Sequence, residues 1–187
     1  MDEAADKPET VRLFVALPVP ADFAARACDL PHWGAIGGRW NHAGDLHITL
    51  RFLGDLPPES VAAIQNALTH VRRPPFHVEV GGLGVFETPR QAVLYARIDS
   101  TRKMNALCGD VSDALTPLGF DFGARPFIPH ITLARLNNSR GIHQYIEKYD
   151  KFVIGHWQAE SFSLMRSGAV NSAGCQYATL ARYKLLS

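Results

Sequence analysis

The chain has few of the features that mark secreted, membrane or metal-binding proteins. Its 187 residues include only three cysteines, Cys28, Cys108 and Cys175, an odd number too widely spaced for a disulfide framework or a metal knuckle. No apolar run approaches the ~20 residues of a membrane-spanning helix. The acidic first nine residues lack the apolar segment of a signal peptide. We therefore expect a cytoplasmic protein with reduced thiols and no membrane contact.

A strong net charge and a phosphate-binding glycine loop are absent as well. The formal net charge is only +1, which argues against contacts with a long nucleic-acid tract but leaves room for a nucleotide or one RNA end. The glycine run at residues 81–84 is not followed by Gly-Lys-Ser/Thr, so it is no P-loop. Because the histidines outside the repeated motif show no metal-ligand spacing, we expect neither a metal nor a cofactor.

What the chain does contain is one tetrapeptide twice. The sequence His-Ile-Thr-Leu occurs at residues 47–50 and again at residues 130–133, each time in apolar, strand-like surroundings. Alternate side chains of a strand share a face, so His and Thr point one way while Ile and Leu point the other. Two such strands lying side by side would place two imidazoles and two hydroxyls on one face.

The surrounding pattern is also repeated, and it predicts the fold. The order strand, helix, His-Thr strand, helix, strand occurs twice, and a C-terminal hairpin follows. The expected elements are strand 11–17, helix 21–30, the first His-Thr strand, helix 59–71, strand 76–80 ended by the glycine run, strand 92–98, a helix from residue 101 with an apolar stripe to Leu118, the second His-Thr strand, a helix capped by Ser139, strand 152–154, and hairpin strands 160–166 and 175–185 around residues 171–174.

This order indicates an α+β fold built as a duplicated, two-lobed unit with a pseudo-two-fold axis. Antiparallel-rich sheets would line a central cleft, with the helices outside. We expect residues 1–10 to form a flexible tail and residues 11–187 to form one domain.

The paired motif suits acid-base chemistry on a phosphate ester. Histidine has an unperturbed pKa of about 6.5, so one neutral and one protonated imidazole can serve as base and acid near pH 7. The threonine hydroxyls can donate hydrogen bonds to the non-bridging oxygens as negative charge develops there. A strained 2',3'-cyclic phosphate would be a suitable substrate for such a site.

Strand alternation makes further predictions for residues near the two motifs. Arg51 falls on the face of the first histidine, from which it could reach the phosphate or the RNA backbone. Phe52 falls with the core-facing residues, so we expect core packing rather than base stacking there. Trp40 and Phe127, by contrast, could stack a base. Arg135 falls on the face opposite the second histidine, unless the strand twists or ends first.

Two segments resemble the two-histidine (2H) phosphoesterases. They are LHITLRFLGDL at residues 46–56, with Arg39-Trp40 upstream, and RPFIPHITLARL at residues 125–136. Within that superfamily they are similar to the bacterial and archaeal RNA 2',3'-cyclic phosphodiesterases, also named 2'-5' RNA ligases. The opening VRLFVALPVP and the closing segment around Tyr177 extend the resemblance over residues 11–185. The resemblance implies a bilobal fold, metal-independent opening of a 2',3'-cyclic phosphate to a 2'-phosphate, and weak reverse joining of RNA ends.

The resemblance also implies roles for single residues. His47 would be the proton donor to O3', and His130 the proton acceptor from water, although exchanged roles would leave the same sequence. Thr49 and Thr132 would bind phosphate oxygens. The family often carries a substrate-contacting arginine where Arg135 stands, so Arg135 joins Arg51 as a candidate substrate-binding residue.

Two alternatives remain open at this point. A nucleotide- or RNA-binding module could use the same cleft without turnover, or the enzyme could hydrolyse another cyclic phosphate or a 2'-5'-linked substrate. In each case the partner is RNA or a nucleotide. Both motifs lie in one chain, so we expect a monomer with no obligate protein partner.

Overall fold

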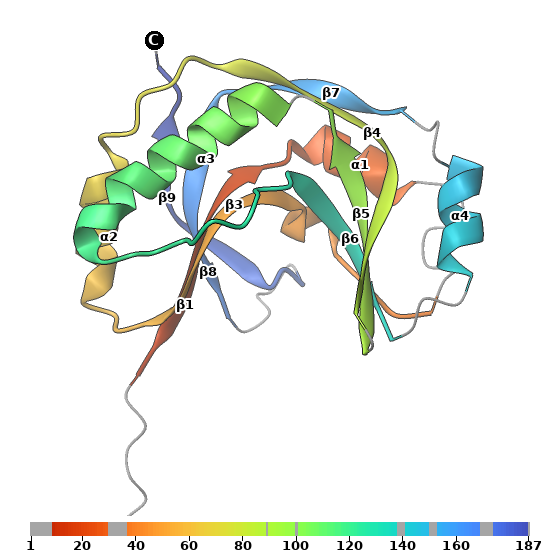
Figure 1. Cartoon of the computed structure of the whole chain (residues 1–187), viewed down its shortest axis with the longest axis horizontal. Coiled ribbons are helices and arrows are strands. Elements are labelled where there is room, and N and C mark those ends of the chain that lie inside the picture. Colours follow the sequence, from red (N-terminus) through yellow and green to blue (C-terminus); the bar gives the residue numbers. More distant parts are fainter. Residues whose placement is uncertain are drawn as a thin grey trace, which may run out of the picture.

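A single antiparallel sheet organises the protein (Figure 1). The computed structural model describes residues 9–29, 37–88, 90–99, 101–137, 141–149, 153–168 and 174–186. The strands are β1 (Val11–Pro18), β2 (Arg39–Trp40), β3 (His47–Leu56), β4 (Phe76–Thr88), β5 (Gln91–Ile98), β6 (His130–Leu136), β7 (Val153–Ala159), β8 (Ser161–Ser167) and β9 (Tyr177–Lys184). The helices are α1 (Ala21–Cys28), α2 (Ser60–Leu68), α3 (Thr101–Leu115) and α4 (Ile142–Tyr149), with short 3-10 helices η1 (Ala43–Asp45) and η2 (Thr116–Leu118).

The duplicated order of elements is confirmed. The segment β1-α1-β3-α2-β4 is followed by β5-α3-β6-α4-β7, and β8 and β9 form the expected hairpin pair. The strand order in the sheet is β7-β4-β5-β6-β3-β1-β8-β9, and β2 pairs with β6. The two His-Thr strands are therefore neighbours at the centre, where Ile48 lies opposite Ile131. The halves of the sheet are continuous across this pair.

The two repeats exchange elements, which the sequence pattern does not reveal. Strand β4 is the last element of the first repeat but pairs with β5 and β7 of the second, and β8 returns to pair with β1. Helix α3 of the second repeat packs on β3 of the first and beside α2, whereas α1 packs against β7. Figure 1 shows α2 and α3 together on one side of the molecule and α4 on the other. Each lobe is thus built from both halves of the chain.

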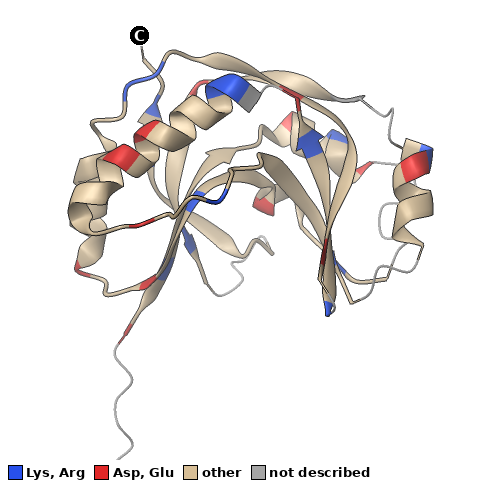
Figure 2. Ribbon diagram, viewed as in Figure 1, with Lys and Arg blue, Asp and Glu red and all other residues tan. Residues whose placement is uncertain are grey.

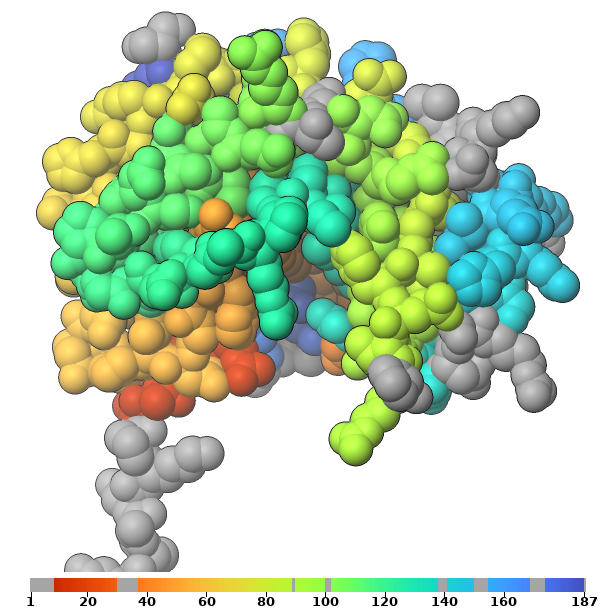
Figure 3. Space-filling view, viewed as in Figure 1, coloured from red at the N-terminus to blue at the C-terminus, as the bar shows by residue number. Residues whose placement is uncertain are grey.

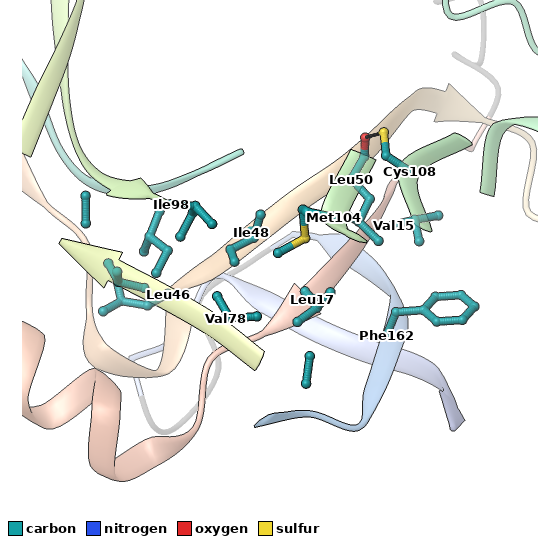
Figure 4. Packing of buried hydrophobic residues seen from close by; sticks show 14 of the residues in the cluster. Val15, Leu17, Leu46, Ile48, Leu50, Val78, Ile98, Met104, Cys108 and Phe162 are labelled. Atoms are coloured by element: carbon teal, nitrogen blue, oxygen red, sulfur yellow. Dashed lines mark hydrogen bonds between the residues drawn. The ribbon is translucent and has the colours of Figure 1, made fainter. Parts of the chain in front are cut away.

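The apolar halves of the two motifs anchor the His-Thr strands in the core. Ile48, Leu50, Ile131 and Leu133 are all buried. Figure 4 shows Ile48 and Leu50 close to Met104 of α3, and the Cys108 thiol donates a hydrogen bond to the carbonyl oxygen of Leu50 at 3.2 Å. Burying each large apolar side chain stabilises the fold by roughly 1.5–3 kcal/mol. Because the Ile and Leu side chains fix one face of each strand in the core, the His and Thr side chains are held on the opposite face.

The expectation that the glycine run ends a strand was wrong. Strand β4 continues through residues 81–84 to Thr88, because the glycines accommodate a bulge. The pairing with β5 shifts register between Val80 and Leu83, and Gly82 has a φ of 68°. At Gly84 an added Cβ would lie 2.4 Å from the ring of Tyr95. Glycine is thus required here for backbone freedom and for close approach to a ring.

Some sequence expectations take a different form in the structure or lie outside its described residues. Leu118 leaves the apolar stripe of α3, because that helix ends at Leu115 and Leu118 is exposed in η2. The predicted cap at Ser139, residue 152 of the predicted strand, the tail through residue 8 and turn residues 171–173 all fall outside the described residues. None of the described helices is long and apolar enough to cross a membrane.

Candidate active site

The His-Thr faces of β3 and β6 line a cleft of about 510 Å³. His47 and Thr49 come from β3, and His130 and Thr132 come from β6, so the structure brings all four residues of the repeated motif together. The remaining lining residues are Arg12, Phe14, Arg39, Asn41, Phe52, Arg135, Ser167, Gln176 and Tyr177. Arg12, Arg39 and Arg135 bring positive charge to the cleft. Figure 2 shows both signs of charge interspersed over the ribbon.

The two imidazoles are held in the same way. Nδ1 of His47 lies 2.7 Å from the carbonyl oxygen of Asp45, and Nδ1 of His130 lies 2.7 Å from the carbonyl oxygen of Ile128. A carbonyl oxygen can only accept a hydrogen bond, so Nδ1 carries the proton in the neutral ring. Nε2 of each ring is then the nitrogen left for chemistry. Nε2 of His47 also lies 3.1 Å from Oγ1 of Thr49.

Aromatic rings pack against both histidines. The centroid of the His47 ring lies 4.9 Å from that of Phe14 and 5.0 Å from that of Tyr177. The His130 ring lies 5.0 Å from Phe86 and 5.3 Å from Tyr95, both approached edge-on. These neighbours restrict ring rotation and remove water from around each imidazole.

Burial lowers the pKa of both imidazoles below the ordinary value of 6.5. The loss of hydration disfavours the charged ring, and the positive charge of Arg135 lowers both pKa values further. His130 also lowers the pKa of His47, so the two rings lie close enough to interact electrostatically. The carbonyl contacts oppose these effects, because they favour a ring that donates from Nδ1. The neutral form of each ring is therefore favoured in the free protein.

The short strand β2 and the next residue, Asn41, hold the backbone of β6 along the edge opposite β5. The side-chain amide of Asn41 donates to the carbonyl oxygen of Thr132 at 2.8 Å, and its backbone N–H donates to that of Leu133 at 2.8 Å. Arg39 of β2 lies opposite Arg135 of β6. These bonds fix the backbone that carries Thr132 and bring two guanidinium groups to the same edge of the cleft.

A bulge in β6 places Arg135 in the cleft, contrary to simple strand alternation. Leu94 pairs with Ala134 and Tyr95 with Thr132, so Leu133 is an extra residue without a direct partner on β5. Leu133 and Ala134 are consequently both buried, and Arg135 returns to the face of His130. A bulge of this kind re-aims the side chains that follow it.

A bulge in β3 likewise overturns the expectations for Arg51 and Phe52. Thr49 pairs with Ala16 and Arg51 with Val15, which leaves Leu50 as the extra residue. Phe52 is therefore not in the core: its side chain is 57% exposed and lines the cleft. Arg51 leaves the face of His47, and its Nε donates to Oγ of Ser112 on α3 at 2.6 Å.

A buried carboxylate ties the C-terminal hairpin to the site, and sequence reasoning missed it. Asp45 is 3% exposed, and its Oδ1 accepts a hydrogen bond from the backbone N–H of Gln176 at 2.8 Å. The side-chain oxygen of Gln176 accepts one from Arg39 at 3.2 Å. These contacts set the position of Tyr177 against His47. They join loop residues far apart in the chain, and no periodic pattern signals them.

A second cavity of about 330 Å³ meets the cleft at the two His-Thr motifs. Thr49 and His130 line both spaces. The other lining residues are Arg51, Phe86, Phe122, Arg125, Pro126, Phe127 and Ile128. Figure 3 shows a hollow beside the teal segment that precedes β6. Phe127 borders this cavity and packs partly against the core, as Trp40 does elsewhere. Within the described residues, no group of three or more His, Cys, Asp or Glu side chains is arranged to hold a metal ion.

Known proteins share this architecture and this sequence pattern. The profile of the 2'-5' RNA ligase superfamily matches residues 36–171. An RNA 2',3'-cyclic phosphodiesterase of Geobacillus stearothermophilus is 40% identical over 99 residues, which are 51% of this chain but only 32% of that protein. One from Aeropyrum pernix is 29% identical over 148 residues, covering 76% of this chain and 84% of the relative. The structure of E. coli LigT complexed with 3'-AMP superposes with a TM-score of 0.77 at 27% identity, covering 96% of this chain and 100% of that one. The chain belongs to the 2'-5' RNA ligase superfamily.

Proposed function

We propose that this protein is an RNA 2',3'-cyclic phosphodiesterase, which opens a cyclic phosphate end to a 2'-phosphomonoester. The observation that carries the proposal is the matched pair of imidazoles. Each is held at Nδ1 by a backbone carbonyl, and each lines the same cleft beside its own threonine. The relatives that carry this activity in their names support it. The proposal extends to a single domain over residues 11–187 and to a cytoplasmic location. We expect this domain to act as a monomer, because both histidines of the cleft come from one chain.

In the proposed reaction, His130 removes a proton from water as the water attacks phosphorus. The P–O3' bond breaks, and His47 donates a proton to O3', which leaves the phosphate on O2'. Two features support this direction. His130 lines both cavities, so water can reach it from a side that the bound nucleoside does not fill. His47 is enclosed by Phe14 and Tyr177 and contacts Thr49, which suits a group that must deliver a proton to a bound ester oxygen.

Charge and stacking would hold the substrate in the cleft. The Thr49 and Thr132 hydroxyls and the Arg135 guanidinium supply hydrogen-bond donors for the phosphate oxygens. The exposed ring of Phe52 offers an apolar face for a base at the cleft mouth. Recognition by these few groups suits one terminal nucleotide better than a long RNA tract.

A binding module without turnover is the principal alternative, and product formation separates the two. EDTA-treated protein is incubated with nucleoside 2',3'-cyclic phosphates and with an RNA that ends in a cyclic phosphate. We expect 2'-phosphate product that persists in EDTA and is lost in His47→Ala and His130→Ala. The variant His77→Ala is the matched control, because His77 is exposed on β4 and lines neither space.

Tight nucleotide binding without product would contradict the proposal and favour the binding module. A 3'-phosphate product would overturn the assigned bond cleavage. Turnover confined to a different cyclic phosphate would retain the mechanism but change the substrate.

A further inference from the structure

The cleft face of β1 and β3 carries a row of side chains that continues beyond the first motif. Along β3, Thr49 is followed by Phe52, which lines the cleft, and then by Asp55. On β1, Phe14 pairs with Phe52, and Arg12 pairs with Asp55 further from the histidines. A cyclic phosphate bound at Thr49 can extend its nucleoside along this row. Its base then lies on Phe52, and the outer edge of the base faces Arg12.

Arg12 is held in the wall of the cleft by one side of its guanidinium group. Nε donates to Oδ1 of Asp55 at 2.9 Å, and Nη2 donates to Oδ2 at 2.8 Å. This bidentate pair uses two of the five N–H groups and fixes the plane of the guanidinium. The end of the group, formed by Nη1 and the second N–H of Nη2, has no hydrogen-bond partner among the residues that the structure describes. Two parallel donors are therefore presented to the cleft.

The ring of Phe52 lies beside these donors. Its side chain is 57% exposed, and the guanidinium carbon of Arg12 lies 5.8 Å from the ring centroid. This distance is close to the outer limit of about 6 Å for a cation–π contact, so the guanidinium is not packed onto the centre of the ring. That face of Phe52 remains open, and a base stacked on it lies within reach of the two donors.

Guanine is the base that matches two parallel donors. Its N7 and O6 are adjacent acceptors on one edge, and a bidentate arginine contact to them is the commonest specific contact in protein–DNA recognition. Adenine presents the acceptor N7 beside the N6 donor, so one N–H of the guanidinium would face another donor. Cytosine and uracil have a single ring, which covers less of Phe52 and extends less far toward Arg12.

We propose that Arg12 is a specificity-determining residue that selects guanine as the base of the terminal nucleotide. Phe52 stacks this base, and Asp55 orients the guanidinium. The inference rests on the proposed function, because it concerns the substrate of the same cleft. The contact with the base is equally strong in the bound substrate and in the transition state, so its loss raises KM and leaves kcat unchanged.

The test is steady-state hydrolysis of the four common nucleoside 2',3'-cyclic phosphates by wild-type protein and by Arg12→Met. Methionine keeps an apolar chain beside Phe52 and removes the donors. In a second variant, Asp55→Asn, one carbonyl oxygen remains to orient Arg12, so the preference for guanine should fall less. The ratio of the kcat/KM values for two substrates is independent of the folded fraction of each preparation.

Arg26→Met is the matched control. Arg26 forms an exposed ion pair with Asp22 at 3.2 Å, and its guanidinium carbon lies 5.8 Å from the ring centroid of Phe23. It thus has the same kinds of contact as Arg12 but does not line the cleft. The control should keep the wild-type preference among bases.

We expect the wild-type kcat/KM for the guanosine substrate to exceed those for the other three by roughly fivefold or more, the lower end of the discrimination that a bidentate base contact provides. Arg12→Met should abolish this preference by raising KM for the guanosine substrate. Equal hydrolysis of all four substrates by wild-type protein, a preference for another base, or equal losses on all four in Arg12→Met would overturn the inference alone. Wild-type protein that hydrolyses none of them would contradict the proposed function, and the inference with it.

Discussion

Replacing Thr132 by valine tests whether the motif hydroxyls stabilise the transition state. Valine keeps the branched shape of threonine and suits a strand, so the backbone of β6 and the bond from Asn41 to the Thr132 carbonyl should persist. The change removes one hydroxyl donor from the wall of the cleft. A donor of this kind gains strength as negative charge builds on the phosphate oxygens, so its loss should lower kcat more than it raises KM.

The size of the loss follows from the setting of the hydroxyl. Removing one donor from a preorganised site costs roughly 2.7–4 kcal/mol in the transition state. Thr132 is only half-buried in a cleft that water can enter, so we expect a loss at or slightly below the lower end of that range. At 1.36 kcal/mol for each factor of ten, about 2–2.7 kcal/mol corresponds to roughly a 30- to 100-fold fall in kcat.

The assay is steady-state hydrolysis of a nucleoside 2',3'-cyclic phosphate, with Thr132→Ser as the control. Serine restores the hydroxyl and should recover most of the activity. The double variant Thr49→Val/Thr132→Val should show losses that multiply, provided that the two donors act independently. A kcat for Thr132→Val within threefold of wild type, or a change confined to KM, would refute the reasoning.

Two further predictions concern pH and stability. Burial and the charge of Arg135 lower the pKa of both histidines, so the state with one neutral and one protonated ring is most populated below pH 6.5. The kcat/KM profile should therefore be bell-shaped with its maximum below pH 6.5, and Arg135→Met should move it toward higher pH; a maximum above pH 7 in wild type would contradict this. Asp45→Ala removes the acceptor of the Gln176 N–H, so urea unfolding should show a loss of about 1–3 kcal/mol, with a smaller loss for Asp45→Asn; equal stability of all three proteins would show that the contact contributes little.

The sequence predicted the elements and the centre of the site because both depend on short-range periodicity. Alternation separated His47 and Thr49 from Ile48 and Leu50 correctly, since the irregularity of β3 begins only at Leu50 and affects the residues after it. Each failure begins at a bulge. The extra residue Leu50 moves Phe52 into the cleft and Arg51 out of it. The extra residue Leu133 moves Arg135 into the cleft. A bulge depends on the partner strand, so one strand read alone does not show it.

Longer-range contacts were less accessible from the sequence. Phe14 did have a signal, because it occupies in β1 the place that Tyr95 occupies in β5, and each ring packs on its own histidine. No sequence pattern indicated the hydrogen bonds of Asn41 and Gln176, because both residues lie outside the regular strands and helices. The exchange of strands and helices between the repeats was equally hidden. The same apolar faces would be buried whether each repeat folded separately or exchanged elements with the other.

That exchange governs when the active site can form during synthesis. Strand β1 precedes β2 to β7 along the chain, whereas its neighbour β8 and the ring of Tyr177 follow them. Helix α3, which covers β3, is also made long after that strand. The first histidine motif therefore leaves the ribosome without most of its partners, and contacts so distant in sequence form slowly. A chain that stops before β8 carries both His-Ile-Thr-Leu motifs but lacks the strand that pairs with β1 and the ring that packs on His47, so the candidate site is complete only after β8 and Tyr177 have been made.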